Sequence, residues 1–131
     1  MIWLLDVNAL IAACLTAHEH HGRVAGWIAS LPATDRLATC SITELGFVRV
    51  IHQAPQFRIP IADGIATLAR LQLSENRKVI RLADARGAGG LPAWVKSARQ
   101  ITDGHLLALA AHHSSTLATL DTGIPGAFLI P

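Results

Sequence analysis

Ile2-Trp3-Leu4-Leu5-Asp6-Val7-Asn8, near the start of the chain, is the stretch that most constrains the fold. Its first four residues form an apolar run with no polar break, which is typical of a strand buried on both faces. The run ends at Asp6, and a helix is predicted over about residues 8–15. Because ligands of open parallel sheets bind outside the carboxyl ends of the strands, Asp6 is a candidate functional residue. Asp is also among the best helix N-caps, so a purely structural role for Asp6 is the alternative.

The length and composition of the chain predict one domain. A chain of 131 residues can bury one good hydrophobic core, and we expect it to span residues 1–131. Apolar residues make up 51% of the chain and charged residues 15%, so some apolar surface is expected at a partner or dimer interface. Charged or histidine residues interrupt every apolar run before the roughly 18–20 residues of a membrane span. No basic segment precedes the first run, so we expect neither a membrane span nor a signal peptide.

The cysteines and the charge balance bear on compartment and partner. Cys14 and Cys40 are the only cysteines and lack the spacing of a metal site, so we interpret them as reduced core residues of a cytoplasmic protein. The net charge is only +2, but few acids are present, and several of them belong to the candidate site described below. The rest of the surface is therefore distinctly positive, which would suit a polyanionic partner.

Helices alternate with strands along most of the chain. Besides the first pair, the spacing of apolar residues predicts strands over 36–40, 78–82, 116–120 and 127–130. Helices are predicted over about 23–30, 45–52, 62–73, 94–99 and 105–113, and Ser41-Ile42-Thr43-Glu44 has the form of a capping box that opens the second of these. The glycines of the loop over 86–92 do not match a phosphate-binding pattern. This alternation predicts an α/β fold, a three-layer sandwich with a central, mainly parallel sheet flanked by helices.

Four acids occupy comparable places in this scheme. Asp6 and Asp121 each end a predicted buried strand, while Glu44 and Asp103 each lie in the first turn of a predicted helix. Right-handed crossovers bring helix starts to the same sheet edge as the strand ends, so all four could meet in one cleft. Taken singly, each acid has an ordinary interpretation as a cap or turn residue.

Four converging carboxylates need compensation for their charge. At roughly 5 Å and an effective dielectric near 20, each like-charged pair costs on the order of 3 kcal/mol. Either protons are taken up or a divalent cation binds. Oxygen ligands without cysteine favour Mg²⁺ or Mn²⁺ over Zn²⁺, and a carboxylate site for such an ion indicates phosphate chemistry.

At this point the sequence resembles the PIN-domain proteins, and specifically the VapC-type toxic ribonucleases of bacterial toxin–antitoxin pairs. The resemblance covers essentially the whole chain and rests on an ordered set of segments. These are Leu5-Asp6-Val7-Asn8-Ala9-Leu10-Ile11, Thr43-Glu44, Thr102-Asp103 followed by Leu106-Leu107-Ala108-Leu109-Ala110, and Ala118-Thr119-Leu120-Asp121.

The resemblance implies a Mg²⁺- or Mn²⁺-dependent endoribonuclease that cleaves RNA. The metal would be held by Asp6, Glu44, Asp103 and Asp121, with Asn8 supporting the first Asp and Thr119 orienting the last or contacting substrate. It also implies a homodimer and a cognate antitoxin that covers the cleft. Many relatives carry a further acid or an aromatic residue just after the last Asp, where this chain has Gly123 and Ile124. That departure leaves a second metal in question.

Three basic residues complete this hypothesis as candidate phosphate contacts, namely Arg86, Lys96 and Arg99. The non-enzymatic alternative is a PIN module that binds RNA or a protein partner without cutting it. A haloacid-dehalogenase-like phosphatase also begins with a strand ending in Asp, but its general acid would stand at position 8, which is Asn8 here. The histidine cluster at 18–21 does not share one helical face and has no supporting cysteine, which disfavours zinc.

Overall fold

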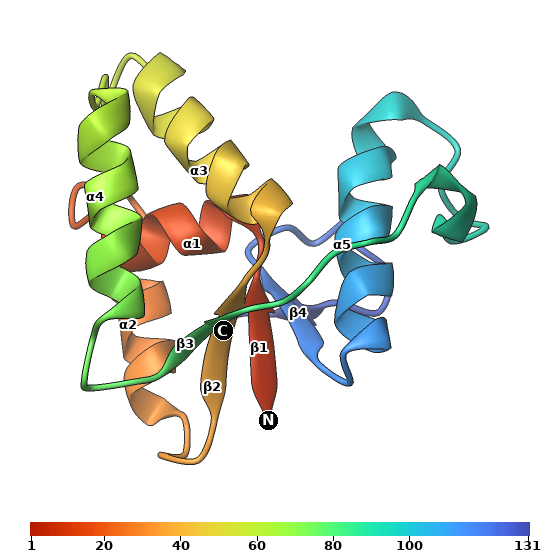
Figure 1. The fold of residues 1–131 in the computed structure, drawn as a ribbon, viewed down its shortest axis with the longest axis horizontal. Coiled ribbons are helices and arrows are strands. Elements are labelled where there is room, and N and C mark those ends of the chain that lie inside the picture. Colours follow the sequence, from red (N-terminus) through yellow and green to blue (C-terminus); the bar gives the residue numbers. More distant parts are fainter.

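Five parallel strands form a single sheet in the order β3-β2-β1-β4-β5, as seen in the computed structural model, which describes residues 1–131 (Figure 1). The strands are β1 (Ile2–Leu5), β2 (Arg36–Thr39), β3 (Val79–Arg81), β4 (Thr116–Thr119) and β5 (Phe128–Leu129). The helices are α1 (Val7–Cys14), α2 (His21–Ser30), α3 (Ser41–Gln53), α4 (Ile61–Gln72) and α5 (Ile101–His112), with short 3₁₀ turns at Ala88–Gly90 and Ala98–Gln100. The predicted parallel sheet is confirmed.

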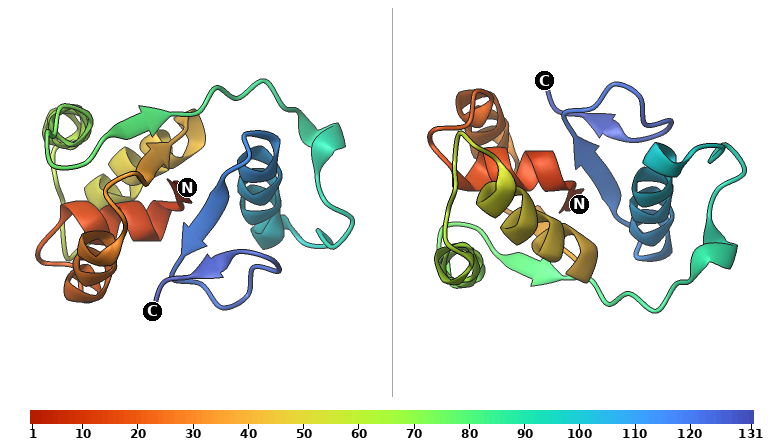
Figure 2. Two further views of the ribbon diagram at one scale, coloured as in Figure 1. Left: turned by 90° about the horizontal axis from the view of Figure 1, so that it is seen from below. Right: turned by 90° about the horizontal axis from the view of Figure 1, so that it is seen from above.

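The central strand supplies both hydrophobic cores. Successive side chains of a strand point to opposite faces, so Trp3 and Leu5 pack with α1, α2, α3 and α4, whereas Leu4 packs against α5. Trp3 also meets Trp27 of α2 edge to face, with 5.4 Å between the ring centroids. Figure 2 shows the helices on the two sides of the sheet. The three-layer sandwich expected from the alternation of helices and strands is therefore confirmed.

The strand order creates one switch point in the sheet. From β1 the chain moves outward through β2 to the edge strand β3, and it then returns to add β4 on the other side of β1. The carboxyl ends of β1 and β4 are therefore neighbours, with Leu5 in register with Ala118. In open α/β sheets, the crevice at such a switch point is the usual ligand site. The starts of α3 and α5 flank this end of the sheet (Figure 1).

Local details differ from the sequence predictions at two helix starts. The capping box of α3 begins one residue earlier than predicted: Cys40 is the N-cap, and its backbone N–H donates to Thr43 Oγ1 at 2.9 Å. Helix α5 begins at Ile101, so Asp103 lies within the first turn and does not cap it. Neither Glu44 nor Asp103 therefore caps its helix.

One predicted helix is wrong. Residues 94–99 form no α-helix, and only the 3₁₀ turn at Ala98–Gln100 precedes α5. The Gln100 side chain explains this end of the loop, because its Oε1 accepts the backbone N–H groups of Lys96 and Ser97 at 2.7 and 3.2 Å. With Ser97 it forms a capping box at the start of this 3₁₀ turn.

Both cysteines are free thiols. Burial raises the pKa of the Cys14 thiol to about 11, so it stays protonated at neutral pH. Because the thiolate is the reactive form, Cys14 is an inert part of the core. None of the helices is long and apolar enough to cross a membrane.

Candidate active site

Asp6 lies at the carboxyl end of β1 and is 7% exposed. One carboxylate oxygen caps α1 by accepting the Ala9 backbone N–H at 2.7 Å, and the other accepts the hydroxyl of Thr119. The capping role and the site role therefore coexist, because each uses a different part of the same carboxylate. These two hydrogen bonds hold Asp6 in one orientation at the switch point.

Asp121 follows β4 and is tied to Asp6 through Thr119. The Thr119 hydroxyl donates to Asp6 and accepts the backbone N–H of Asp121 at 2.9 Å. Asp121 Oδ1 accepts the Gly123 N–H at 2.7 Å, which fixes a tight turn. The residue is exposed and lines a pocket together with Asn8 of α1. Thr119 is 1% exposed, and in this structure its hydroxyl serves the two Asp residues.

The three aspartates interact electrostatically. Burial raises the pKa of Asp6 above its ordinary value despite its hydrogen bonds, and the charges of Asp103 and Asp121 raise it further. Burial and the charge of Asp121 raise the pKa of Asp103, while Arg99 lowers it. The charges of side chains from β1, α5 and the end of β4 therefore act on one another, while the fourth predicted acid, Glu44, is not among them. The resulting repulsion favours a bound cation or proton uptake.

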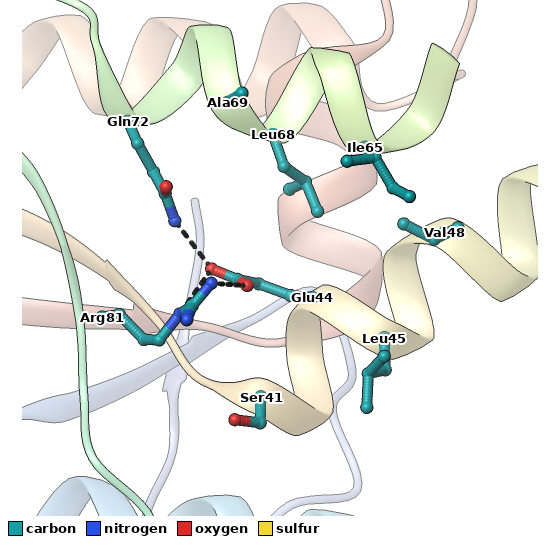
Figure 3. Close-up of a pocket in the computed structure, with 9 residues that line it drawn as sticks. All are labelled: Ser41, Glu44, Leu45, Val48, Ile65, Leu68, Ala69, Gln72 and Arg81. Atoms are coloured by element: carbon teal, nitrogen blue, oxygen red, sulfur yellow. Dashed lines mark hydrogen bonds and ion pairs between the residues drawn. The ribbon is translucent and has the colours of Figure 1, made fainter. Parts of the chain in front are cut away.

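Glu44 is held away from the three aspartates. Its Oε1 accepts hydrogen bonds from Thr39 Oγ1 and Gln72 Nε2, both at 2.8 Å. Arg81 Nη2 lies 2.6 Å from Oε2, and Arg81 Nε lies 3.3 Å from Oε1. Figure 3 shows this cluster at one end of a pocket between α3 and α4. No three carboxylate, imidazole or thiol side chains lie close enough to ligate one ion in this arrangement.

The predicted RNA-contacting residues occupy different settings, and two of them, Asn8 and Arg99, are related to an aspartate of the site. Asn8 is exposed in the first turn of α1 and lines a pocket together with Asp121. Lys96 and Arg99 are exposed on the segment before α5, and Arg99 acts on the Asp103 charge. Arg86 is half-buried, and its Nε has no hydrogen-bond partner.

The PIN domain family model matches residues 3–127. The chain belongs to the PIN domain family. Ribonuclease VapC38 of Mycobacterium tuberculosis is 37% identical over 123 residues, which cover 92% of this chain and 86% of that protein. Ribonuclease VapC44 of the same species is 36% identical, with coverage of 95% and 92%.

Solved structures share the architecture of this PIN domain. Mycobacterium tuberculosis VapC20, described as a toxin that cleaves the sarcin–ricin loop, has a TM-score of 0.61 at 14% identity, covering 98% of this chain and 99% of that chain. Rickettsia felis VapBC2, solved with a DNA fragment from its promoter, has a TM-score of 0.60 at 14% identity, with coverage of 98% and 97%. At such identities the likeness shows the fold alone.

The PIN domain also contains two polar pairings that sequence reasoning missed. Arg81 and Gln72 contact Glu44 from β3 and α4, although the sequence analysis assigned them no role. His105 Nε2 lies 2.5 Å from Asp84 Oδ2. This contact links the segment after β3 to α5, and His105 is two residues after Asp103. The position of Arg81 at the end of β3, next to β2 and the start of α3, is the feature that indicates its contact with Glu44. It was overlooked because basic residues on an edge strand are usually solvated.

The raised pKa values predict how the metal-free protein responds to pH. A carboxyl whose pKa is raised by folding stabilises the fold at pH values below its unfolded pKa, near 3.9, and this contribution is lost as the pH rises through the folded pKa. We therefore expect Asp103→Asn, measured in EDTA by thermal unfolding, to gain stability relative to the wild type as the pH rises from about 4 to about 7. A difference that is constant or shrinks over this range would contradict the charge repulsion.

Proposed function

We propose that this PIN domain is a divalent-metal-dependent endoribonuclease, the toxin of a toxin–antitoxin pair, that hydrolyses RNA. The observation that carries this proposal is the electrostatic interaction of Asp6, Asp103 and Asp121 at the β1–β4 switch point, where burial and neighbouring aspartate charges raise the pKa values of Asp6 and Asp103. The relatives named Ribonuclease VapC, at 36–37% identity over most of the chain, support the choice of RNA as substrate.

The chemistry of the donors fits Mg²⁺ or Mn²⁺, and the side chains would have to move closer together to ligate one ion. The donors are hard carboxylate oxygens, which these ions prefer, and the mutual repulsion of the three aspartates would be relieved by a divalent cation. We assign Asp6, Asp103, Asp121 and Glu44 as the residues that hold it. Such an ion polarises a phosphoryl oxygen and lowers the pKa of water for attack on phosphorus.

The chain's own side chains supply orientation and charge. Ala9 and Thr119 fix the Asp6 carboxylate, so its position does not have to be organised during the reaction. Arg99 and Lys96 are exposed beside the start of α5, where they would attract RNA phosphates, and we keep Arg86 and Asn8 as further substrate contacts. To join the aspartates around an ion, Glu44 would have to leave Arg81.

We further propose that a cognate antitoxin and a second copy of the chain are the protein partners. Support comes from exposed apolar side chains, because Leu45 is 70% exposed, Ile65 57% and Ile61 53%. The first two line the pocket of about 380 Å³ between α3 and α4, which ends at Glu44 and Arg81 (Figure 3). The structures of Rickettsia felis VapBC2 and of FitAB, a complex solved on an IR36 DNA fragment, share the fold of this chain.

The experiment that tests the function is cleavage of end-labelled total RNA by the protein freed of any co-purifying partner. We expect discrete products with Mg²⁺ or Mn²⁺ and none with EDTA. Absence of cleavage by folded protein under every metal would favour the non-catalytic alternative, a PIN module that binds RNA or protein. The pairing of Glu44 with Arg81 is the observation that keeps this alternative open.

A further inference from the structure

Two adjoining pockets lead away from the aspartates over the connection between α1 and α2. The first, of about 330 Å³, is lined by Asn8, His18, Glu19, His20, Leu120 and Asp121. The second, of about 370 Å³, is lined by Ala17, His18, Glu19, Gln56 and Phe57. His18 and Glu19 belong to both pockets and form the wall between them. The first pocket therefore begins at a proposed metal ligand, and the second continues away from it.

The ring of His18 is fixed and uncharged. Its Nδ1 accepts the backbone N–H of His20 at 3.0 Å, so the ring proton is on Nε2. Burial and the neighbouring His20 lower the pKa of His18, which keeps the imidazole neutral at neutral pH. The ring lies nearly parallel to that of Phe57, with 14° between the planes and 6.3 Å between the centroids. His18 thus offers an aromatic face and one N–H donor.

We propose that these two pockets bind two successive unpaired nucleobases of the RNA, next to the bond that is cut. This inference rests on the proposed function, since it places the bases relative to the aspartates. Single-stranded RNA is recognised by stacking on aromatic rings, including histidine, and by hydrogen bonds to the base edges. The imidazole of His18, the carboxylate of Glu19 and the amide of Gln56 provide these groups.

The charges of the lining favour bases over phosphates. Glu19 and Asp121 both line the first pocket, and Glu19 is also part of the second. The Glu19 carboxylate would repel a phosphate, whereas it accepts hydrogen bonds from amino and imino groups of bases. The backbone phosphates would instead follow the basic residues before α5, such as Lys96 and Arg99. The histidine cluster at 18–20 therefore acquires a role in selecting substrate rather than in binding metal.

The test uses fluorescein-labelled single-stranded RNA decamers of random sequence, and binding is measured by anisotropy in EDTA so that no cleavage occurs. We expect His18→Ala to weaken binding by about fivefold, a value within the range of base–aromatic stacking. His18→Phe keeps an aromatic ring and should retain most of the affinity. A variant that failed to fold would not retain it. The matched control is His112→Ala, an exposed histidine at the end of α5.

A second probe separates bases from phosphates. The wild type should bind a decamer with abasic sugars at all positions more weakly than it binds the RNA decamer. In His18→Ala most of this difference in affinity should be lost. If the wild type cleaves total RNA with Mn²⁺ but His18→Ala binds both probes as the wild type does, the nucleobase pockets are wrong and the nuclease stands. If the wild type neither cleaves nor binds RNA, the proposed function fails together with this inference.

Discussion

The Asp103→Asn variant is expected to lose metal-dependent RNA cleavage by about a thousandfold or more. Asp103 enters the site from the first turn of α5 and shares its charge repulsion with Asp121. Removing one anionic oxygen ligand weakens metal binding and lowers the stabilisation of charge at phosphorus, an effect of several kcal/mol. Rates of cleavage of labelled RNA at saturating Mn²⁺ would measure the loss.

Asp63→Asn is the matched control for this prediction. Asp63 is also an acid in the first turn of a helix, α4, but it is exposed and lies outside the candidate site. The control removes the same charge from the same kind of helix position, so it should cleave as the wild type does. Comparable activity in Asp103→Asn and wild type would remove Asp103 from the site. Equal losses in both variants would indicate a general effect of charge on RNA binding.

The Arg81→Gln variant is expected to bind Mn²⁺ about tenfold more tightly than the wild type. Arg81 occupies both oxygens of Glu44, with its closest nitrogen at 2.6 Å, so an ion that recruits Glu44 must displace the guanidinium. The substitution removes a competing ion pair and a positive charge that repels the incoming cation. Gln retains a neutral donor of similar reach. Calorimetric titration with Mn²⁺ measures the effect without any need for catalysis.

The control for this experiment is Arg36→Gln, which removes the same charge from the opposite end of the sheet. Arg36 is the exposed first residue of β2. Its substitution should leave the Mn²⁺ affinity unchanged. If Arg81→Gln also binds Mn²⁺ with the wild-type affinity, Glu44 remains on Arg81 while the ion is bound and is not a ligand. Tighter binding in both variants would indicate only a long-range charge effect.

The features that sequence predicted well are those decided by local patterns. The unbroken apolar run of β1 implied burial on both faces, and Leu4 and Leu5 do face opposite cores. A parallel sheet with strand ends and helix starts at one edge then follows from the connection rules. These rules predicted that Asp6 would lie at the same sheet edge as Asp103 and Asp121, which follow it by 97 and 115 residues. The assignment of metal ligands itself stays a prediction.

What sequence did not reveal depends on particular long-range contacts. Arg81 meets Glu44 across 37 residues of chain, and no periodicity or cap signal marks such a pair. Gln100 accepts backbone N–H groups of the preceding loop and caps a 3₁₀ turn, a contact that the composition of residues 94–99 did not indicate. The Cys40 N-cap was missed because cysteine is not a preferred capping residue, and Thr43 supplies the hydrogen bond instead.

The measurement that tests the central claim most directly is a crystal structure of the wild-type protein grown with Mn²⁺, with the ion located by its anomalous scattering. The account predicts an ion bound by Asp6, Asp103 and Asp121, with Glu44 turned away from Arg81 toward it. An ion found elsewhere, or no ion at the β1–β4 switch point at a concentration that supports RNA cleavage, would contradict the account.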